Sequence, residues 1–169
     1  MPTKINTKIV NKRCSKINIW KYSKEPEEKE TVEKEMPVVK FKDNEQLNAY
    51  LKEWQSKLQL NDWLITASLT DGKCYIGKEE CSGKNIYQVE NRLSAISISN
   101  YWDEDFMTKQ YQELVLVHEL LHLIIPIENH NEETLETIMY DRTMHGIIER
   151  IAKALIMAKY DMKLEDFLA

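Results

Sequence analysis

The sequence lacks most of the features that mark secreted or membrane-bound proteins. Its three cysteines are an odd number without a Cys-x-x-Cys pair, so we expect free thiols rather than a disulfide framework. No apolar run approaches the roughly 18 residues that a membrane-spanning helix needs. The N-terminus also lacks the apolar segment of a secretory signal. We therefore expect a cytoplasmic protein that does not contact a membrane.

The sequence also lacks an excess of positive charge. Its 23 basic residues are outnumbered by 28 acidic ones, for a net charge of −5. The molecule as a whole therefore has no electrostatic preference for nucleic acid. At 169 residues the chain is long enough to bury a core without disulfides or a structural metal.

Charge is unevenly distributed in the first 38 residues. Seven lysines and arginines and no acidic residue occur in residues 1–24, whereas residues 25–35 hold six glutamates and two lysines. Such blocks are usually solvated. We expect residues 1–38 to form a basic arm and an acidic linker, followed by one folded domain over 39–169. The alternative interpretation is an arm that contacts nucleic acid or a partner.

Hydrophobic periodicity predicts the elements of this domain. A helix should begin near Asp43 or Asn44, because apolar residues follow at positions 47, 50, 51, 54 and 58. Cys74 and Cys81 are predicted to flank a hairpin turn through Gly77, and a zinc or redox role for them stays open. Strands are predicted over 63–69, 73–76, 85–89 and 94–99, with a hairpin-type turn at Asp71-Gly72 and an edge at 94–99 that could pair with a peptide.

Two longer segments follow the strands. A helix is predicted from about 104 to 125, where Pro126 ends it. Residues 132–160 have helical periodicity and are predicted to form one helix or two. The first of these segments is nearly all apolar at its centre, so it should be buried on most sides.

That apolar segment contains the sequence His118-Glu119-Leu120-Leu121-His122. Two histidines four residues apart on a helix point the same way, so both rings can bind one metal ion. This is the H-E-x-x-H pattern of metal-dependent peptidases. Bound zinc would lower the pKa of its water to about 7. Glu119 would be the general base that takes a proton from this zinc-bound water.

A catalytic zinc site needs a third protein ligand. His145, in the last helical segment, is the first choice, since Gly146 beside it would let the two helices pack closely. Glu149 lies one turn further along the same face, and it is the second choice for the ligand. If it is not a ligand, it would orient His145 or be a solvated surface residue. Glu136 and Asp141 remain open as further candidates.

Together these elements resemble the minimal zincins, the H-E-x-x-H metallopeptidase superfamily, and more narrowly the small metallopeptidase-like proteins of bacteriophages and prophages. The resemblance covers about residues 40–160 and rests on segments 62–63, 95–99, 117–122 and 147–155. It implies an α+β, minimal zincin-like domain, in which a small twisted sheet packs on the H-E-x-x-H helix. A C-terminal helix would supply the third ligand, and His145 occupies the family's position for it.

The predicted function is therefore that of a zinc-dependent metallopeptidase. It would hold Zn²⁺ on His118, His122 and His145 and hydrolyse peptide bonds of a protein or peptide substrate. A phage-encoded chain would work in the bacterial host cytoplasm, where a host protein is a further expected partner. One alternative is a non-enzymatic binding or regulatory protein that retains the zinc site. Another is a nucleic-acid-associated protease of the SprT-like kind, although the zinc-ribbon cysteines of that group are absent.

Overall fold

The computed structural model describes residues 35–76, 79–101, 111–125, 127 and 134–167. The chain divides into two compact units, Met1–Glu33 and Lys34–Ala169, and every described residue belongs to the second. The predicted arm and linker thus lie almost wholly outside the described residues, and the boundary at residue 38 stays a prediction. No helix in the described part of the chain is both long and apolar enough to cross a membrane.

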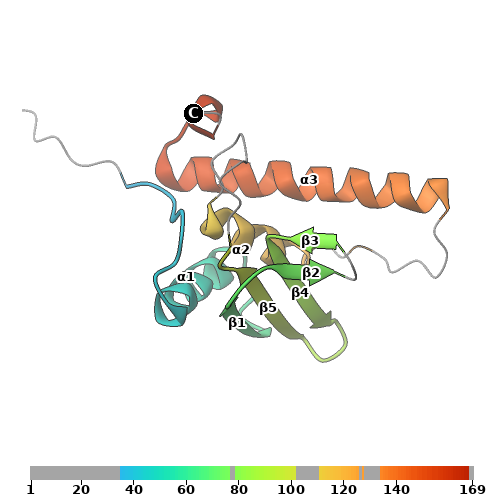
Figure 1. Ribbon diagram of the computed structural model, residues 1–169, viewed down its shortest axis with the longest axis horizontal. Helices are drawn as coiled ribbons and strands as arrows, with labels where there is room; N and C mark the ends of the chain where they lie inside the picture. The colour runs from blue at the N-terminus through green and yellow to red at the C-terminus, as the bar shows by residue number, and fades with distance from the viewer. Residues whose placement is uncertain (1–34, 77–78, 102–110, 126, 128–133, 168–169) are drawn as a thin grey trace, which may run out of the picture. The chain divides into compact units, whose positions relative to one another are not determined.

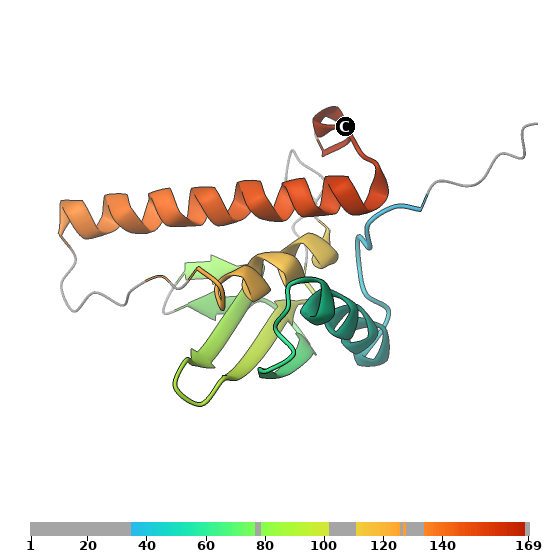
Figure 2. The same cartoon turned by 180° about the vertical axis from the view of Figure 1, so that it is seen from behind.

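The described residues form a mixed α and β structure, which confirms the coarse fold class. Helices α1 and α2 pack on one face of a small sheet, and α3 lies across α2 on the side away from the sheet (Figures 1 and 2). In chain order the elements are α1 (Asn44–Lys57), β1 (Leu64–Thr70), β2 (Cys74–Ile76), β3 (Glu79–Cys81), β4 (Gly83–Gln88), β5 (Leu93–Ser99), α2 (Gln112–Leu121), α3 (Leu135–Tyr160) and the short 3-10 helix η1 (Leu164–Phe167).

Strand β5 is the centre of a three-stranded sheet with the order β1-β5-β4. It runs parallel to β1 and antiparallel to β4. Ile96 and Ile98 are buried on its helix-covered face, whereas Ala95 between Ser94 and Ile96 is exposed, which confirms the predicted alternation. Because β5 is paired on both sides, the idea that residues 94–99 offer a free edge to a peptide is wrong. The edge strands are β1 and β4.

The predicted hairpin-type turn at Asp71-Gly72 is also wrong. Strand β1 pairs with β5, whereas β2 pairs with β3. Parallel neighbours need a long crossover connection, and here the chain passes through β2, β3 and β4 before β5 runs beside β1. The second predicted hairpin is confirmed, because Cys74 lies opposite Cys81 in the antiparallel β2-β3 pair.

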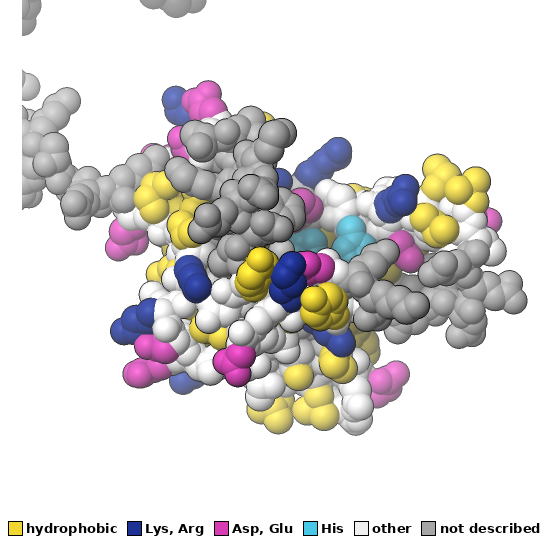
Figure 3. All heavy atoms as spheres, in the orientation of Figure 1, with side chains coloured by type: hydrophobic (Ala, Val, Ile, Leu, Met, Phe, Trp, Pro, Cys, Tyr) yellow, Lys and Arg dark blue, Asp and Glu magenta, His cyan; other side chains and the backbone are white. Residues whose placement is uncertain are grey.

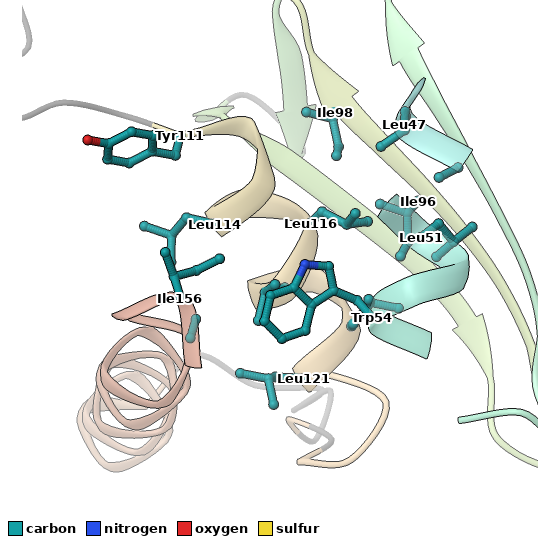
Figure 4. Close-up of a cluster of buried hydrophobic side chains, with 14 of the residues drawn as sticks. Leu47, Leu51, Trp54, Ile96, Ile98, Tyr111, Leu114, Leu116, Leu121 and Ile156 are labelled. Atoms are coloured by element: carbon teal, nitrogen blue, oxygen red, sulfur yellow. The ribbon is translucent and has the colours of Figure 1, made fainter. Parts of the chain in front are cut away.

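Helix α1 forms where the apolar spacing predicts it. The Asp43 side chain caps its N-terminus by accepting a 2.8 Å hydrogen bond from the backbone N–H of Gln46. Leu47, Leu51 and Trp54 are buried against the inner face of the sheet and against α2 (Figure 4). Full burial of an apolar side chain of this size contributes about 1.5–3 kcal/mol, so this face holds α1 on the sheet.

Helix α2 is shorter than the predicted span of 104–125, of which residues 104–110 lie outside the described residues. Tyr111 has extended backbone angles (φ −114°, ψ 123°), so α2 begins at Gln112. The first helical N–H groups lack partners within their own helix. Here the backbone N–H of Gln112 donates to the carbonyl of Val39 at 3.0 Å, and that of Glu113 to Val38 at 3.2 Å.

The C-terminal end of α2 also comes earlier than predicted, at Leu121 rather than at Ile125. Leu123 and Ile124 donate their N–H groups to carbonyls three residues back, which is the tighter 3-10 pattern. The backbone N–H of Ile125, the residue before Pro126 in the sequence, still donates to the carbonyl of Leu121 at 2.8 Å. One irregular turn therefore follows the last helical residue.

Glu113 joins α2 to both other helices through a fully buried carboxylate. It accepts hydrogen bonds from the Val38 backbone N–H at 3.1 Å and the Trp54 indole N–H at 2.9 Å. It also accepts from Lys159 Nζ at 2.9 Å and the Tyr160 hydroxyl at 2.6 Å. A buried charge needs such partners, and these come from α1, α3 and the segment that precedes α1.

The last segment is one helix, α3, rather than two. Thr134 and Thr137 form a capping box at its start. Its buried residues all lie in the C-terminal half, where the helix contacts α2. They are Ile148, Ala152, Ile156 and Tyr160.

Candidate metal centre

Two of the predicted ligands come from the end of α2. His118 lies in its last turn, and His122 is the C-cap residue with near-helical angles (φ −61°, ψ −21°). The four-residue spacing of a helix is therefore preserved just past the last helical residue. The centroids of the two rings are 5.1 Å apart. Both side chains are partly buried.

His145 of α3 joins these two histidines. Its ring centroid lies 6.1 Å from that of His118 and 5.1 Å from that of His122. One nitrogen of each ring lies within 4.8 Å of the others, an arrangement that could hold a metal ion.

Two of the rings are oriented by hydrogen bonds at Nδ1. His118 Nδ1 lies 3.2 Å from Glu149 Oε2, and His145 Nδ1 lies 2.9 Å from the backbone carbonyl of Asp141. A carboxylate and a carbonyl can only accept, so Nδ1 carries the proton in both rings. The lone pair is left on Nε2, as a metal ligand requires.

Glu149, the second choice for the third ligand, contacts His118 rather than His145. Its other carboxylate oxygen lies 3.0 Å from Lys153 Nζ. The hydrogen bond from His118, followed by that from Lys153, lowers the pKa of Glu149 to about 2 against the opposing effect of burial. The carboxylate is therefore ionised at neutral pH. It contacts the Nδ1 side of the His118 ring and is not one of the three clustered ligand groups.

His122 is partly buried, like His118, whereas His145 is exposed. Burial, and then the neighbouring His118 and His145, lower its pKa to about 4. The ring is therefore neutral at physiological pH in the metal-free protein. A neutral imidazole is the form that binds a metal ion.

Glu119 is buried beside these histidines, with 7% of its surface exposed. Burial raises the pKa of its carboxyl group to about 7, although the nearby His118 acts in the opposite direction. The side chain of Asn85 in β4 donates a 2.8 Å hydrogen bond to the backbone carbonyl of Glu119. Ser94 Oγ donates in turn to Asn85 Oδ1 at 2.8 Å, so the sheet fixes this part of α2.

The carboxyl group of Glu119 fits against β4 because Gly83 has no side chain. A Cβ at residue 83 would lie 2.5 Å from Val115 Cγ1 and 2.8 Å from Glu119 Oε1. Both distances are shorter than any normal contact. The sequence pattern did not single out Gly83 or Asn85, although an isolated glycine in a strand often marks a close approach of another group.

Gly146 does not have the role predicted for it. It is exposed, and a Cβ there would meet nothing within 4 Å. Close packing of α3 on α2 comes instead from the buried side chains further along α3, such as Ile148 and Ala152. Glycine is therefore not what brings His145 to the other two histidines.

The two further candidates, Glu136 and Asp141, do not join the histidine cluster as side-chain ligands. Glu136 is exposed in the first turn of α3. Asp141 contributes its backbone carbonyl to His145.

The histidine cluster reaches the molecular surface. Figure 3 shows histidine side chains between α3 and the rest of the described domain. His145 itself is exposed, and His118 keeps 19% of its side chain exposed. Within the described part of the domain, the cluster is therefore partly exposed to solvent.

Comparisons with protein-family models, curated proteins and solved structures gave no match to this chain.

Proposed function

We propose that this chain is a zinc-dependent metallopeptidase with a zincin-like fold. The observation that carries the proposal is the convergence of His118, His122 and His145, with one nitrogen of each within 4.8 Å of the others. Three protein ligands are the number that catalytic zinc sites use, because a fourth position must stay open. The packing of α2 between the sheet and α3 supports the zincin-like arrangement.

The donor set fits zinc better than magnesium or calcium. Those two ions prefer oxygen ligands, whereas imidazole nitrogen suits zinc and its neighbours in the first transition row. When bound, zinc would act as a Lewis acid on a substrate carbonyl and make water more acidic. Glu149 would hold the His118 ring in the ligand tautomer, and the Asp141 carbonyl would do the same for His145.

Glu119 would be the general base and then the general acid. Its raised pKa of about 7 lies near neutral pH, where a carboxyl group can both accept a proton and return it. Anchoring of the Glu119 backbone by Asn85 would limit its movement during this exchange. Glu119 would thus take a proton from water and later pass it to the leaving amine.

The proposal is tested by comparing the wild-type protein with Glu119→Gln. Both proteins, loaded with zinc, would be incubated with a mixture of unstructured peptides, and new termini would be counted by mass spectrometry. We expect cleavage by the wild type and a loss of at least about 100-fold in the variant, with zinc content unchanged. Cleavage that survives Glu119→Gln would contradict the role of this residue.

Zinc binding without cleavage would instead support the non-enzymatic alternative. In that case the histidine cluster would stabilise the fold or a binding surface. The same samples separate the two functions, because zinc content and peptide cleavage are measured on each of them.

A further inference from the structure

The β2-β3 hairpin places two cysteines directly opposite each other. Cys74 and Cys81 are paired in its register, and both are free thiols. Opposed residues in an antiparallel pair have Cα atoms about 4.5–5.5 Å apart. A disulfide bond spans Cα distances of about 4.4–6.8 Å. The hairpin thus already provides the backbone geometry for a bond between these two residues.

Both side chains lie on the same face of the hairpin, because directly opposed residues share a face. Cys74 is buried, and its thiol lies 3.8 Å from the carbonyl oxygen of Ser97 in the central strand β5. Cys81 is partly exposed. Burial, and then the proximity of Cys74 and of Glu119, raise the pKa of the Cys81 thiol to about 11. The two sulfur atoms are therefore neighbours, and the pair adjoins the candidate catalytic carboxyl group.

We propose that Cys74 and Cys81 are a redox-modification site that closes to a cross-strand disulfide by exchange with a small-molecule disulfide such as glutathione disulfide. This inference does not depend on the proposed peptidase function. It needs only the register of the hairpin and access to Cys81.

The exchange takes place in two balanced steps. The Cys81 thiol loses its proton, and its sulfur attacks glutathione disulfide, forming a mixed disulfide and releasing one glutathione thiol. Cys74 then attacks the Cys81 sulfur, which forms the Cys74–Cys81 bond and releases the second glutathione. The protein loses two electrons and two protons, and one glutathione disulfide becomes two glutathione thiols. Because the thiol of Cys81 is protonated at neutral pH, the first step is slow.

Closure of this bond would also act on the strand that packs against Glu119. Strand β3 ends at Cys81, and only Ser82 separates it from Gly83, the first residue of β4. Gly83 contacts Val115 and the carboxyl group of Glu119. The disulfide would restrain Cys81, and with it the short link through Ser82 to Gly83. Slower amide hydrogen exchange is therefore expected in β2 and β3.

The test uses the full chain carrying Cys14→Ser, so that Cys74 and Cys81 are the only thiols. The protein is treated with a chelator, incubated with glutathione disulfide, then unfolded and alkylated. The expected product is a monomer that carries neither alkyl groups nor glutathione and is lighter by two hydrogen atoms. The matched controls, Cys14→Ser with either Cys74→Ser or Cys81→Ser, cannot close the bond, and the variant that keeps Cys81 should accumulate a glutathione adduct.

Recovery of two alkylated thiols, of two glutathione adducts or of a disulfide-linked dimer would overturn the proposal.

The wild-type chain gives a second measurement that does not depend on how the variants fold. Trypsin cleaves after Lys73, Lys78 and Lys84, so the bond would link peptides 74–78 and 79–84. A link from Cys14 to either cysteine instead would contradict the proposed pairing.

Discussion

Glu149 Oε2 lies 3.2 Å from Nδ1 of His118, across the contact between α3 and α2. This hydrogen bond sets the tautomer of His118 and places a negative charge behind a ring that would bind a cation. His145 lies one helical turn before Glu149, so a single stretch of α3 contributes both a candidate ligand and the residue that orients another ligand. The position of α3 on α2 therefore determines whether the three histidines of the candidate metal centre come together.

Glu149→Gln should weaken zinc binding without removing a ligand. An amide can still contact His118 but lacks the negative charge, and loss of such an outer partner typically lowers metal affinity about 10–100-fold. Competition with a chromophoric chelator measures this change. Glu136→Gln, an exposed substitution on the same helix, is the matched control and should leave zinc affinity unchanged. Equal affinities for the two variants would mean that Glu149 does not act on the metal centre.

Two glycine substitutions should have opposite effects on stability. Gly83→Ala would force a Cβ to within 2.5 Å of Val115 and 2.8 Å of Glu119, and such overpacking typically costs about 1–3 kcal/mol. Gly146→Ala meets nothing within 4 Å and should stabilise α3 by up to about 1 kcal/mol. Urea unfolding of both variants provides the comparison. A neutral Gly83→Ala would show that Glu119 is not packed against β4 in this way.

Burial of Glu119 predicts a specific pH dependence of stability in the metal-free protein. The folded-state pKa of about 7 exceeds the ordinary value of 4.5, so the folded protein holds this proton after the unfolded chain has lost it. The contribution of Glu119 to stability therefore falls as the pH rises from about 4.5 to 7. Glu119→Gln removes this effect because its side chain cannot ionise.

The measured quantity is the free energy of unfolding of Glu119→Gln minus that of the wild type. Near pH 4 this difference should not change with pH. Toward pH 8 it should increase in favour of the variant, by about 3 kcal/mol at most. His122, whose pKa is lowered to about 4, has the opposite effect on stability, but it is present in both proteins and cancels in the difference. Denaturant unfolding at several pH values, with a chelator present, measures this difference. A stability difference that does not vary with pH would contradict a buried, neutral Glu119.

Local sequence patterns predicted much of this fold. The spacing of Leu47, Leu51 and Trp54 gave α1, and the alternation around Ile96 and Ile98 gave the buried face of β5. The four-residue spacing of His118 and His122 placed both rings on one side of α2. Each of these features depends on residues a few positions apart, whose relative directions follow from helix or strand geometry alone.

Several features that the sequence did not predict depend on residues far away in the chain. The parallel pairing of β1 with β5 has no turn signal, because the connection passes through three other strands. The start of α2 depends on carbonyl groups of Val38 and Val39, more than 70 residues earlier in the chain. His145 was predicted from its place on the last helix, but the reason given for it, Gly146, was wrong. Non-local packing of α3 brings that histidine to the other two.

The most direct test of the central claim is the zinc content of the wild-type protein and of His145→Ala, measured by elemental analysis after equilibration with a weak chelator. The account predicts one zinc per wild-type chain and little or none in the variant, whose circular dichroism should stay helical because residue 145 is exposed. Arg142→Ala, exposed one turn earlier on α3, is the control and should retain zinc. A wild-type protein without stoichiometric zinc, or a His145→Ala variant that keeps it, would contradict a three-histidine metal centre.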